Sequence, residues 1–300
     1  MSVMRVPARS PRAGRLALAA LALVAAPAEA ARRGAPGSTE VVVDYGINLA
    51  GVPIGTAHLA GAFEGNRYRV DVSATLTGLV GAITGGQGSA RSSGTVGAGP
   101  QPNAFAIATR TASAGIAVRM ALAGGNVTRA EVTPPLVDMQ DRVPVSAANK
   151  RGVMDPASAL LMPARARGDL TDPENCNRVL PVFDGATRFN VVLSYGETRS
   201  VEKPGYSGPI LVCNARYQAI AGHRPDRPGV RFMEENRDMS VWLAPVEGTR
   251  MLVPMRIAVR TTIGTNIIEA TRWSQSSNPT ASGTAGTAGS SIAQASLPGQ

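Results

Sequence analysis

Cysteine and histidine are both scarce in this sequence, with two of each in 300 residues. Protein zinc sites draw mainly on these two residue types, and neither His58 nor His223 has a second histidine at metal-ligand spacing. The cysteines, Cys176 and Cys213, are too far apart for the redox motif in which two residues separate the pair. We therefore predict no metal site and no cofactor.

The motifs of common enzymes are also missing. The serine in Gly205-Tyr206-Ser207-Gly208 lacks the spacing of a nucleophile elbow, and no strong helix follows the glycines near residue 86, as a dinucleotide site requires. Asp184 precedes a glycine between two apolar runs, which is typical of a hairpin turn. We predict no catalytic residues, although the sequence leaves open whether the protein is an enzyme.

Aromatic residues make up only 4% of the chain, and Lys150 and Lys203 are its only lysines. Nucleic-acid surfaces combine dense basic stretches with aromatic rings on which bases stack. Here the arginines are scattered, and four of those behind the formal net charge of +9 lie within the first 15 residues. We therefore predict no nucleic-acid partner.

No apolar run is long enough to cross a membrane. The run at residues 16–26 is about half the length of roughly 20 residues that a spanning helix needs. Basic residues precede it and Ala28-Glu29-Ala30 follows it, which is the order of a cleavable signal peptide. We predict that residues 1–30 are removed after Ala30, and that the mature protein is periplasmic and soluble rather than membrane-spanning.

Charge and aromatic rings are absent from residues 274–300, which are almost entirely small or polar. Such a segment cannot bury enough apolar surface to offset the entropy lost on ordering. We predict a disordered low-complexity tail at 274–300, a disordered linker at 31–39, and a single β-rich domain at 40–273.

What the chain does contain is alternation of apolar and polar residues. At residues 67–77, for example, Tyr68 and Val70 alternate with Arg69 and Asp71, which is typical of a strand with one wet face. Turn residues between such segments predict hairpins. The predicted strands are 40–50, 54–63, 67–77, 116–123 and 127–132, then 179–183, 187–195, 210–220, 239–243, 251–262 and 266–273.

One short helix is predicted between the two halves. Asp155 can cap its first turn, Pro156 suits its first position, and residues 157–162 continue it until Pro163. A helix this short should lie against the sheet, and Pro254 indicates an edge strand or a bulge. The predicted fold is mainly β: a curved antiparallel meander sheet, an open or half-closed barrel, with one short helix packed on it.

The two cysteines of an exported chain are most simply explained as a disulfide. A bridge from Cys176 to Cys213 would tie the start of a predicted three-strand unit to its end, which requires Cα atoms within about 7 Å. Two free, reactive thiols are the alternative.

The loop containing His223, Arg224 and Asp226 is the one candidate functional segment, because it is polar and directly follows an apolar strand. Loops on rigid scaffolds often carry function, but an ion pair of Asp226 with Arg224 or Arg227 explains the loop equally well. His58 lies in a predicted strand with no acid near it in sequence, and is interpreted as a packed or half-exposed strand residue.

Several segments together resemble a known family. They are Tyr45-Gly46, Gly51-Val52-Pro53-Ile54-Gly55, Val143-Pro144-Val145, residues 152–163, Cys176-Asn177-Arg178, Val182-Phe183-Asp184-Gly185, and residues 208–213, 220–225, 241–245 and 253–257. Their order and spacing resemble the exported bacterial family called domain of unknown function 3108, of alphaproteobacterial type, over residues 41–273. The resemblance implies an envelope location and a β-rich fold, and supplies no catalytic residues.

Two non-catalytic functions fit these observations. The first is a periplasmic binding or carrier module for an apolar envelope ligand, such as a lipid or an acyl chain, which needs a pocket of roughly 300 Å³ or more. The alternative is a protein-interaction module in envelope assembly without a ligand cavity. A third hypothesis is a hydrolase using the His223 loop, for which the sequence offers no partner nucleophile.

Overall fold

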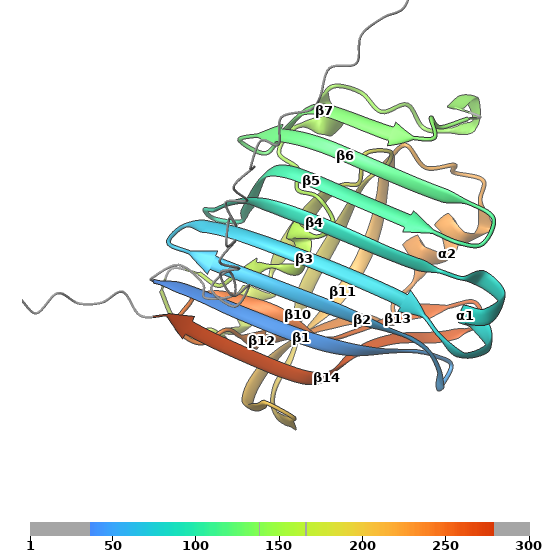
Figure 1. Cartoon of the computed structure of the whole chain (residues 1–300). Coiled ribbons are helices and arrows are strands. Elements are labelled where there is room, and N and C mark those ends of the chain that lie inside the picture. The colour runs from blue at the N-terminus through green and yellow to red at the C-terminus, as the bar shows by residue number, and fades with distance from the viewer. Residues whose placement is uncertain (1–36, 138, 166, 279–300) are drawn as a thin grey trace, which may run out of the picture. The chain divides into compact units, whose positions relative to one another are not determined.

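The computed structural model describes residues 37–137, 139–165 and 167–278 (Figure 1). The predicted signal peptide, its cleavage site after Ala30 and residues 279–300 of the predicted tail lie outside these ranges. Among the described residues, no helix has both the length and the apolar composition needed to cross a bilayer.

Fourteen strands form one antiparallel sheet (Figure 1). They are β1 (Ser38–Leu49), β2 (Val52–Glu64), β3 (Arg67–Leu76), β4 (Gln87–Val96), β5 (Pro100–Arg110), β6 (Gly115–Ala123), β7 (Asn126–Thr133), β8 (Met162–Pro163), β9 (Arg178–Phe183), β10 (Arg188–Lys203), β11 (Tyr206–Ala221), β12 (Met239–Pro245), β13 (Met251–Thr261) and β14 (Gly264–Asn278). The α-helices are α1 (Gly78–Thr84) and α2 (Pro228–Glu235).

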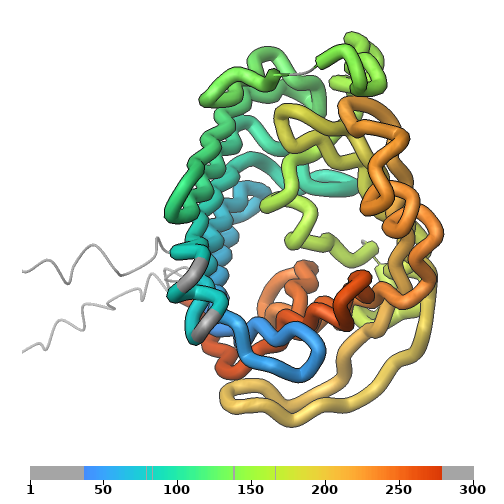
Figure 2. The backbone as a smooth tube through the Cα atoms, turned by 90° about the vertical axis from the view of Figure 1, so that its right-hand side faces the viewer, coloured from blue at the N-terminus to red at the C-terminus, as the bar shows by residue number. Residues whose placement is uncertain are grey.

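The strand order is β7-β6-β5-β4-β3-β2-β1-β14-β13-β12-β11-β10-β9, and β8 pairs with β13 off this path. Two meanders are therefore joined through the pair of β1 with β14. The sheet bends around an interior without closing, since β7 and β9 end it on either side (Figure 2). The predicted curved antiparallel meander, an open barrel, is confirmed.

A loop spans part of the gap between the two end strands. The Val153 N–H donates to the carbonyl of Gly125, in the turn before β7, at 2.7 Å. The Met154 N–H donates to the carbonyl of Pro181 in β9 at 2.9 Å, and Phe183 N–H donates back to Met154. These bonds partly satisfy strand edges that would otherwise be free to pair with another chain.

Both ends of the sheet extend beyond the boundaries expected from composition. β1 begins at Ser38, inside the predicted linker at 31–39, and β14 continues to Asn278, inside the predicted tail at 274–300. Ser38 lies opposite Asn278 in the β1–β14 register. Backbone hydrogen bonds, which do not depend on side-chain hydrophobicity, order these polar residues.

Strands β4 and β5 were not predicted. Their residues are mostly Ser, Ala, Gly, Thr and Pro, so the apolar alternation is weak. The strands form because β3 and β6 supply ladders on either side. The polar loop that was expected around residues 223–228 leads into α2, which was not predicted either.

The helix expected over residues 155–162 is instead a single 3₁₀ turn at Ser158–Leu160. Asp155 does cap it, because its Oδ1 accepts from the N–H groups of Ala157 and Ser158, each at 2.9 Å. The chain then becomes extended, since Met162 and Pro163 pair with β13 as strand β8. This pairing ends the helical turn earlier than the sequence pattern indicated.

The interior contains two hydrophobic clusters, between which residues 153–164 run (Figure 2). The large cluster consists mainly of Val41, Val43, Tyr45, Leu59, Phe63, Tyr68, Val70, Phe105, Val118, Met120, Leu122, Ala157, Leu161, Phe183, Ile210, Val253 and Trp273. The small cluster consists of Met162, Ala164, Cys176, Leu193, Leu211, Cys213, Ala215, Met239, Leu243 and Leu252.

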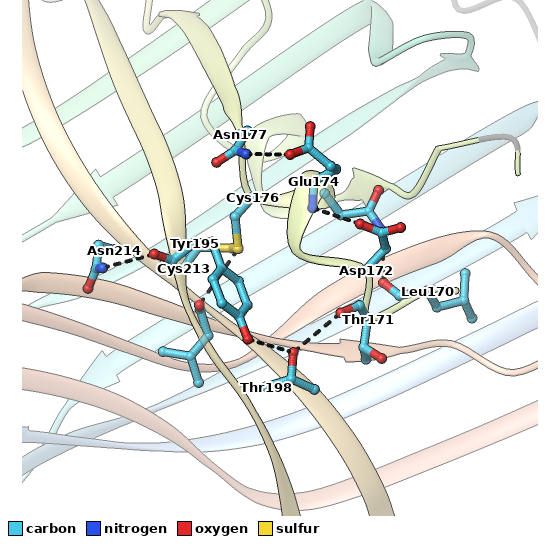
Figure 3. Close-up of a disulfide and its surroundings, with 12 residues drawn as sticks. Leu170, Thr171, Asp172, Glu174, Cys176, Asn177, Tyr195, Thr198, Cys213 and Asn214 are labelled. Atoms are coloured by element: carbon cyan, nitrogen blue, oxygen red, sulfur yellow. Dashed lines mark hydrogen bonds between the residues drawn. A yellow bond between two sulfur atoms is a disulfide. The ribbon is translucent and has the colours of Figure 1, made fainter. Parts of the chain in front are cut away.

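Cys176 and Cys213 form a disulfide at the centre of the small cluster (Figure 3). Their Cα atoms are 5.4 Å apart and 37 residues separate them in sequence. Because β9, β10 and β11 are neighbours, the bridge ties the start of a three-strand unit to its end, as predicted. Pro254 lies at a bulge opposite Leu243, and its strand β13 is central rather than at an edge.

Candidate functional site

An apolar cavity of about 290 Å³ lies beside the small cluster. Strands β9 to β13 line it with alternate residues, for example Leu180 and Val182 of β9 or Val191 and Leu193 of β10. Residues two apart in a strand point to the same face, so the cavity wall follows directly from the apolar alternation of these strands.

Other elements complete the cavity wall. Ala159 and Leu160 belong to the loop that crosses the interior, and Met233 belongs to α2. The rings of Phe189 and Tyr217 also line the cavity, with their centroids 5.3 Å apart. An apolar chain could replace the missing packing contacts in such a space, since dry apolar cavities lack partner atoms for dispersion attraction.

A buried polar network lies on the other side of the same loop. Asp155 is completely buried, and its Oδ2 accepts from the hydroxyls of Ser92 at 2.7 Å and Ser158 at 2.6 Å. The Tyr68 hydroxyl lies 2.7 Å from Ser158 Oγ. Burial raises the pKa of Asp155 above its ordinary value and raises that of Tyr68 to about 12.

This network fixes the loop rather than performing chemistry. Every oxygen of the Asp155 carboxylate is hydrogen-bonded within the protein, and Asp155 is not among the residues that line the apolar cavity. A satisfied buried polar network specifies one arrangement of its neighbours. It therefore positions Ala159 and Leu160 at the cavity.

The predicted loop containing His223, Arg224 and Asp226 lies away from the cavity lining. His223 accepts a backbone hydrogen bond from Val143, and its Nδ1 is buried without a hydrogen-bond partner among the described residues. Asp226 pairs with Arg231 at 3.2 Å, and both side chains are largely exposed. The loop leads into α2, and its own role stays a prediction.

An unpredicted polar row crosses β1, β2 and β3, where Asp44, His58 and Ser73 lie opposite one another. Asp44 Oδ1 is 2.8 Å from His58 Nδ1, and both side chains are about half exposed. The order resembles a hydrolytic triad. However, β2 and β3 pair on both sides, so their N–H groups are engaged in ladders and supply no oxyanion hole.

The comparisons with known proteins agree with the fold. The family described as "Protein of unknown function (DUF3108)" matches residues 42–271. The chain belongs to this family. No curated protein matches the DUF3108 chain.

One solved structure similar to the DUF3108 chain is the crystal structure of a β-barrel-like protein of domain of unknown function DUF1849 from Brucella abortus. The two share 8% sequence identity, with a TM-score of 0.47, and the match covers 80% of this chain and 98% of the other. Neither comparison assigns a functional residue.

The apolar cavity was missed by residue-level analysis of the sequence. Leu180, Val191 and Tyr217 were recognised as strand residues, but strand alternation alone does not distinguish a filled interior from an open one. The available signal was the small size of Ala159 and Ala215, which leave space where larger side chains would meet.

Proposed function

We propose that this protein is a non-catalytic binding or carrier module for an apolar ligand of the cell envelope, such as a lipid or an acyl chain. The observation that carries the proposal is the cavity of about 290 Å³ between strands β9–β13, the loop at 156–162 and α2. Its volume lies at the lower bound of small-molecule sites, which hold roughly 300 to 1,000 Å³. This size favours a slender chain over a bulky ring system.

The cavity also favours this function over the alternatives. A protein-interaction module in envelope assembly needs no interior space, whereas here the sheet, the loop and a helix all border one. For a hydrolase, neither the His223 loop nor the row at His58 combines a nucleophile, a base and oxyanion donors.

The proposed compartment is the periplasm, reached by export and cleavage after Ala30. The disulfide of Cys176 with Cys213 supports this location, because disulfides persist in oxidising compartments and are rare in the bacterial cytosol. Mass spectrometry of the protein recovered from its native cell should show a chain beginning at Ala31. Full-length protein in the cytoplasm would contradict export.

Native mass spectrometry and solvent extraction of the purified protein test ligand binding. We expect a co-purified apolar molecule with the wild-type protein. Ala159→Phe places a ring in the cavity and should remove that molecule without unfolding the protein. Ala104→Phe is the matched control, because Ala104 is an exposed residue of β5.

Two results would overturn the proposal. One is that wild-type protein carries no apolar molecule and binds no added fatty acid or fatty alcohol. The other is equal binding by the wild-type protein and the folded Ala159→Phe variant, which would place the ligand elsewhere.

A further inference from the structure

A second pocket, of about 850 Å³, lies where the tips of several hairpins meet. Its wall combines the start of β1, the β2–β3 and β4–β5 turns, residues 163–165, the first residue of β9 and the turn before β13. Glycine is frequent in this wall, for example at Gly65, Gly97 and Gly248. Backbone at these positions leaves room that larger side chains would occupy.

Four arginines line this pocket: Arg67, Arg165, Arg178 and Arg250. No aspartate or glutamate is among the described lining residues. The pocket therefore concentrates positive charge in a concave surface, which raises the local concentration of anions.

Two of these arginines are balanced by carboxylates outside the lining. Arg67 pairs with Glu64 at 3.2 Å and Arg165 pairs with Glu174 at 2.9 Å. These side chains are about half or more exposed, so solvent screens both pairs. They leave the other two guanidinium groups to be considered.

Arg178 is partly buried and has no carboxylate partner among the described residues. Its Nη1 donates to the carbonyl of Pro163 at 2.9 Å, while its buried Nε has no partner in the structure. Burial, and then the charge of Arg165, lower the pKa of Arg178 from its ordinary value. A buried cation that lacks a counter-charge is costly, and a bound anion would relieve that cost.

Arg250 is held in place by backbone rather than by an acid. Its Nε donates to the carbonyl of Arg165 at 2.7 Å and its Nη2 to that of Gly168 at 3.1 Å. Asp169, which is fully exposed, is the acid whose pKa Arg250 helps to lower. The two carbonyl bonds fix the guanidinium plane and leave its remaining N–H group for a ligand.

The basic pocket adjoins the apolar cavity along the chain. Arg178 lies two residues before Leu180 in β9, so both side chains are on the same face of that strand. Met162 lines the apolar cavity and the next residue, Pro163, lines the basic pocket. One strand therefore presents a cation and then apolar residues in series.

We propose that the basic pocket binds an oxyanion, a carboxylate or phosphate group, with Arg178 and Arg250 as its principal contacts. Guanidinium groups match these anions because they donate two parallel hydrogen bonds. Where the oxyanion is the headgroup of an acyl ligand, the inference rests on the proposed function. Where it is a free anion, the site stands alone.

Isothermal titration with three probes separates these sources. Inorganic phosphate tests the pocket alone, oleyl alcohol tests the apolar cavity alone, and oleate tests both together. We expect oleate to bind at least about tenfold more tightly than oleyl alcohol, and its affinity to fall as salt screens the arginines.

Arg178→Gln and Arg250→Gln should each weaken oleate or phosphate binding by about tenfold and leave oleyl alcohol unaffected. Arg178→Lys keeps the charge but loses the planar fork, so it should restore only part of the affinity. Arg119→Gln is the control, because Arg119 is an exposed residue of β6 outside this pocket.

The outcomes are distinct. Phosphate binding that depends on Arg178, without preference for oleate over the alcohol, supports a site for a free anion. Oleyl alcohol binding that is lost in Ala159→Phe, with oleate and phosphate both insensitive to Arg178 and Arg250, overturns the basic site and leaves the proposed function standing. If no apolar probe binds, the proposed function fails and the phosphate titration alone decides this inference.

Discussion

The large and small hydrophobic clusters solve the same packing problem in different ways. The large cluster is filled by branched and aromatic side chains such as Leu59, Phe105 and Phe183. The small cluster contains the disulfide and borders a cavity of about 290 Å³. One interior therefore contains a close-packed part and an open part.

The difference indicates where stability and function reside. Close packing and the Asp155 network hold the loop that divides the interior. The covalent bond between Cys176 and Cys213 holds the open part, where missing packing contacts would otherwise weaken the structure. A disulfide can compensate for a cavity because it acts mainly on the unfolded chain and requires no added volume.

The largest effect expected is the loss of the Asp155 carboxylate. Asp155→Ala leaves the buried N–H groups of Ala157 and Ser158 without an acceptor, which should lower the free energy of unfolding by about 4 kcal/mol. Urea denaturation measures this. Asp155→Asn is the control, since it keeps one acceptor oxygen, and a loss below about 1 kcal/mol in the alanine variant would contradict the structural role.

Removal of the disulfide should have a slightly smaller effect. The double variant Cys176→Ala, Cys213→Ala opens a loop with a sequence separation of 37, for which chain entropy gives a loss of about 3 to 4 kcal/mol. Thermal unfolding with and without reductant checks it. The reductant should destabilise the wild-type protein alone, and free thiols in oxidised wild-type protein would refute the bridge.

Two alanines in one loop compare the two parts of the interior directly. Ala157 is buried in the large cluster and Ala159 lines the cavity. Ala157→Leu should cost about 2 kcal/mol by overpacking, whereas Ala159→Leu should change the free energy of unfolding by less than about 0.5 kcal/mol. Equal losses in urea denaturation would show that the two parts are packed alike.

The smallest effect is the pH dependence from Asp155. Burial raises its pKa in the folded protein, so the folded state binds the proton more tightly than the unfolded state. Its contribution to stability is therefore largest at low pH and falls as pH rises from its ordinary value near 3.8 through the raised value.

Denaturation curves of wild type and Asp155→Asn between pH 4 and pH 8 measure that contribution. The advantage of the wild-type protein over the variant should shrink with rising pH. An advantage that grows with pH would mean that the four hydrogen bonds outweigh burial and hold the pKa low.

Much of the fold could be predicted from local patterns. The alternation at residues 67–77, the turn at Asp184 and the cap at Asp155 were each recognisable because they depend on nearby residues. The missing strands β4 and β5 lack large apolar residues and depend on their neighbours for pairing. The family resemblance was confirmed over residues 42–271.

The candidate sites were beyond local patterns. Leu180 and Ala159 line the cavity together, and Arg178 and Arg250 meet in the basic pocket, although about seventy residues separate the members of that second pair. The pair of Asp44 with His58 is another example, because an acid distant along the chain becomes the direct cross-strand neighbour. No spacing rule connects such residues before strand order is known.

By itself the sequence determined which segments are strands and that Cys176 and Cys213 form the one bridge available, because backbone periodicity and cysteine count are local properties of the chain. Tertiary structure decided that β14 pairs with β1, that the sheet bends without closing, and that an apolar cavity and a basic pocket lie beside each other along β9. Those features depend on sheet curvature and side-chain volumes, which arise only when distant strands pack together.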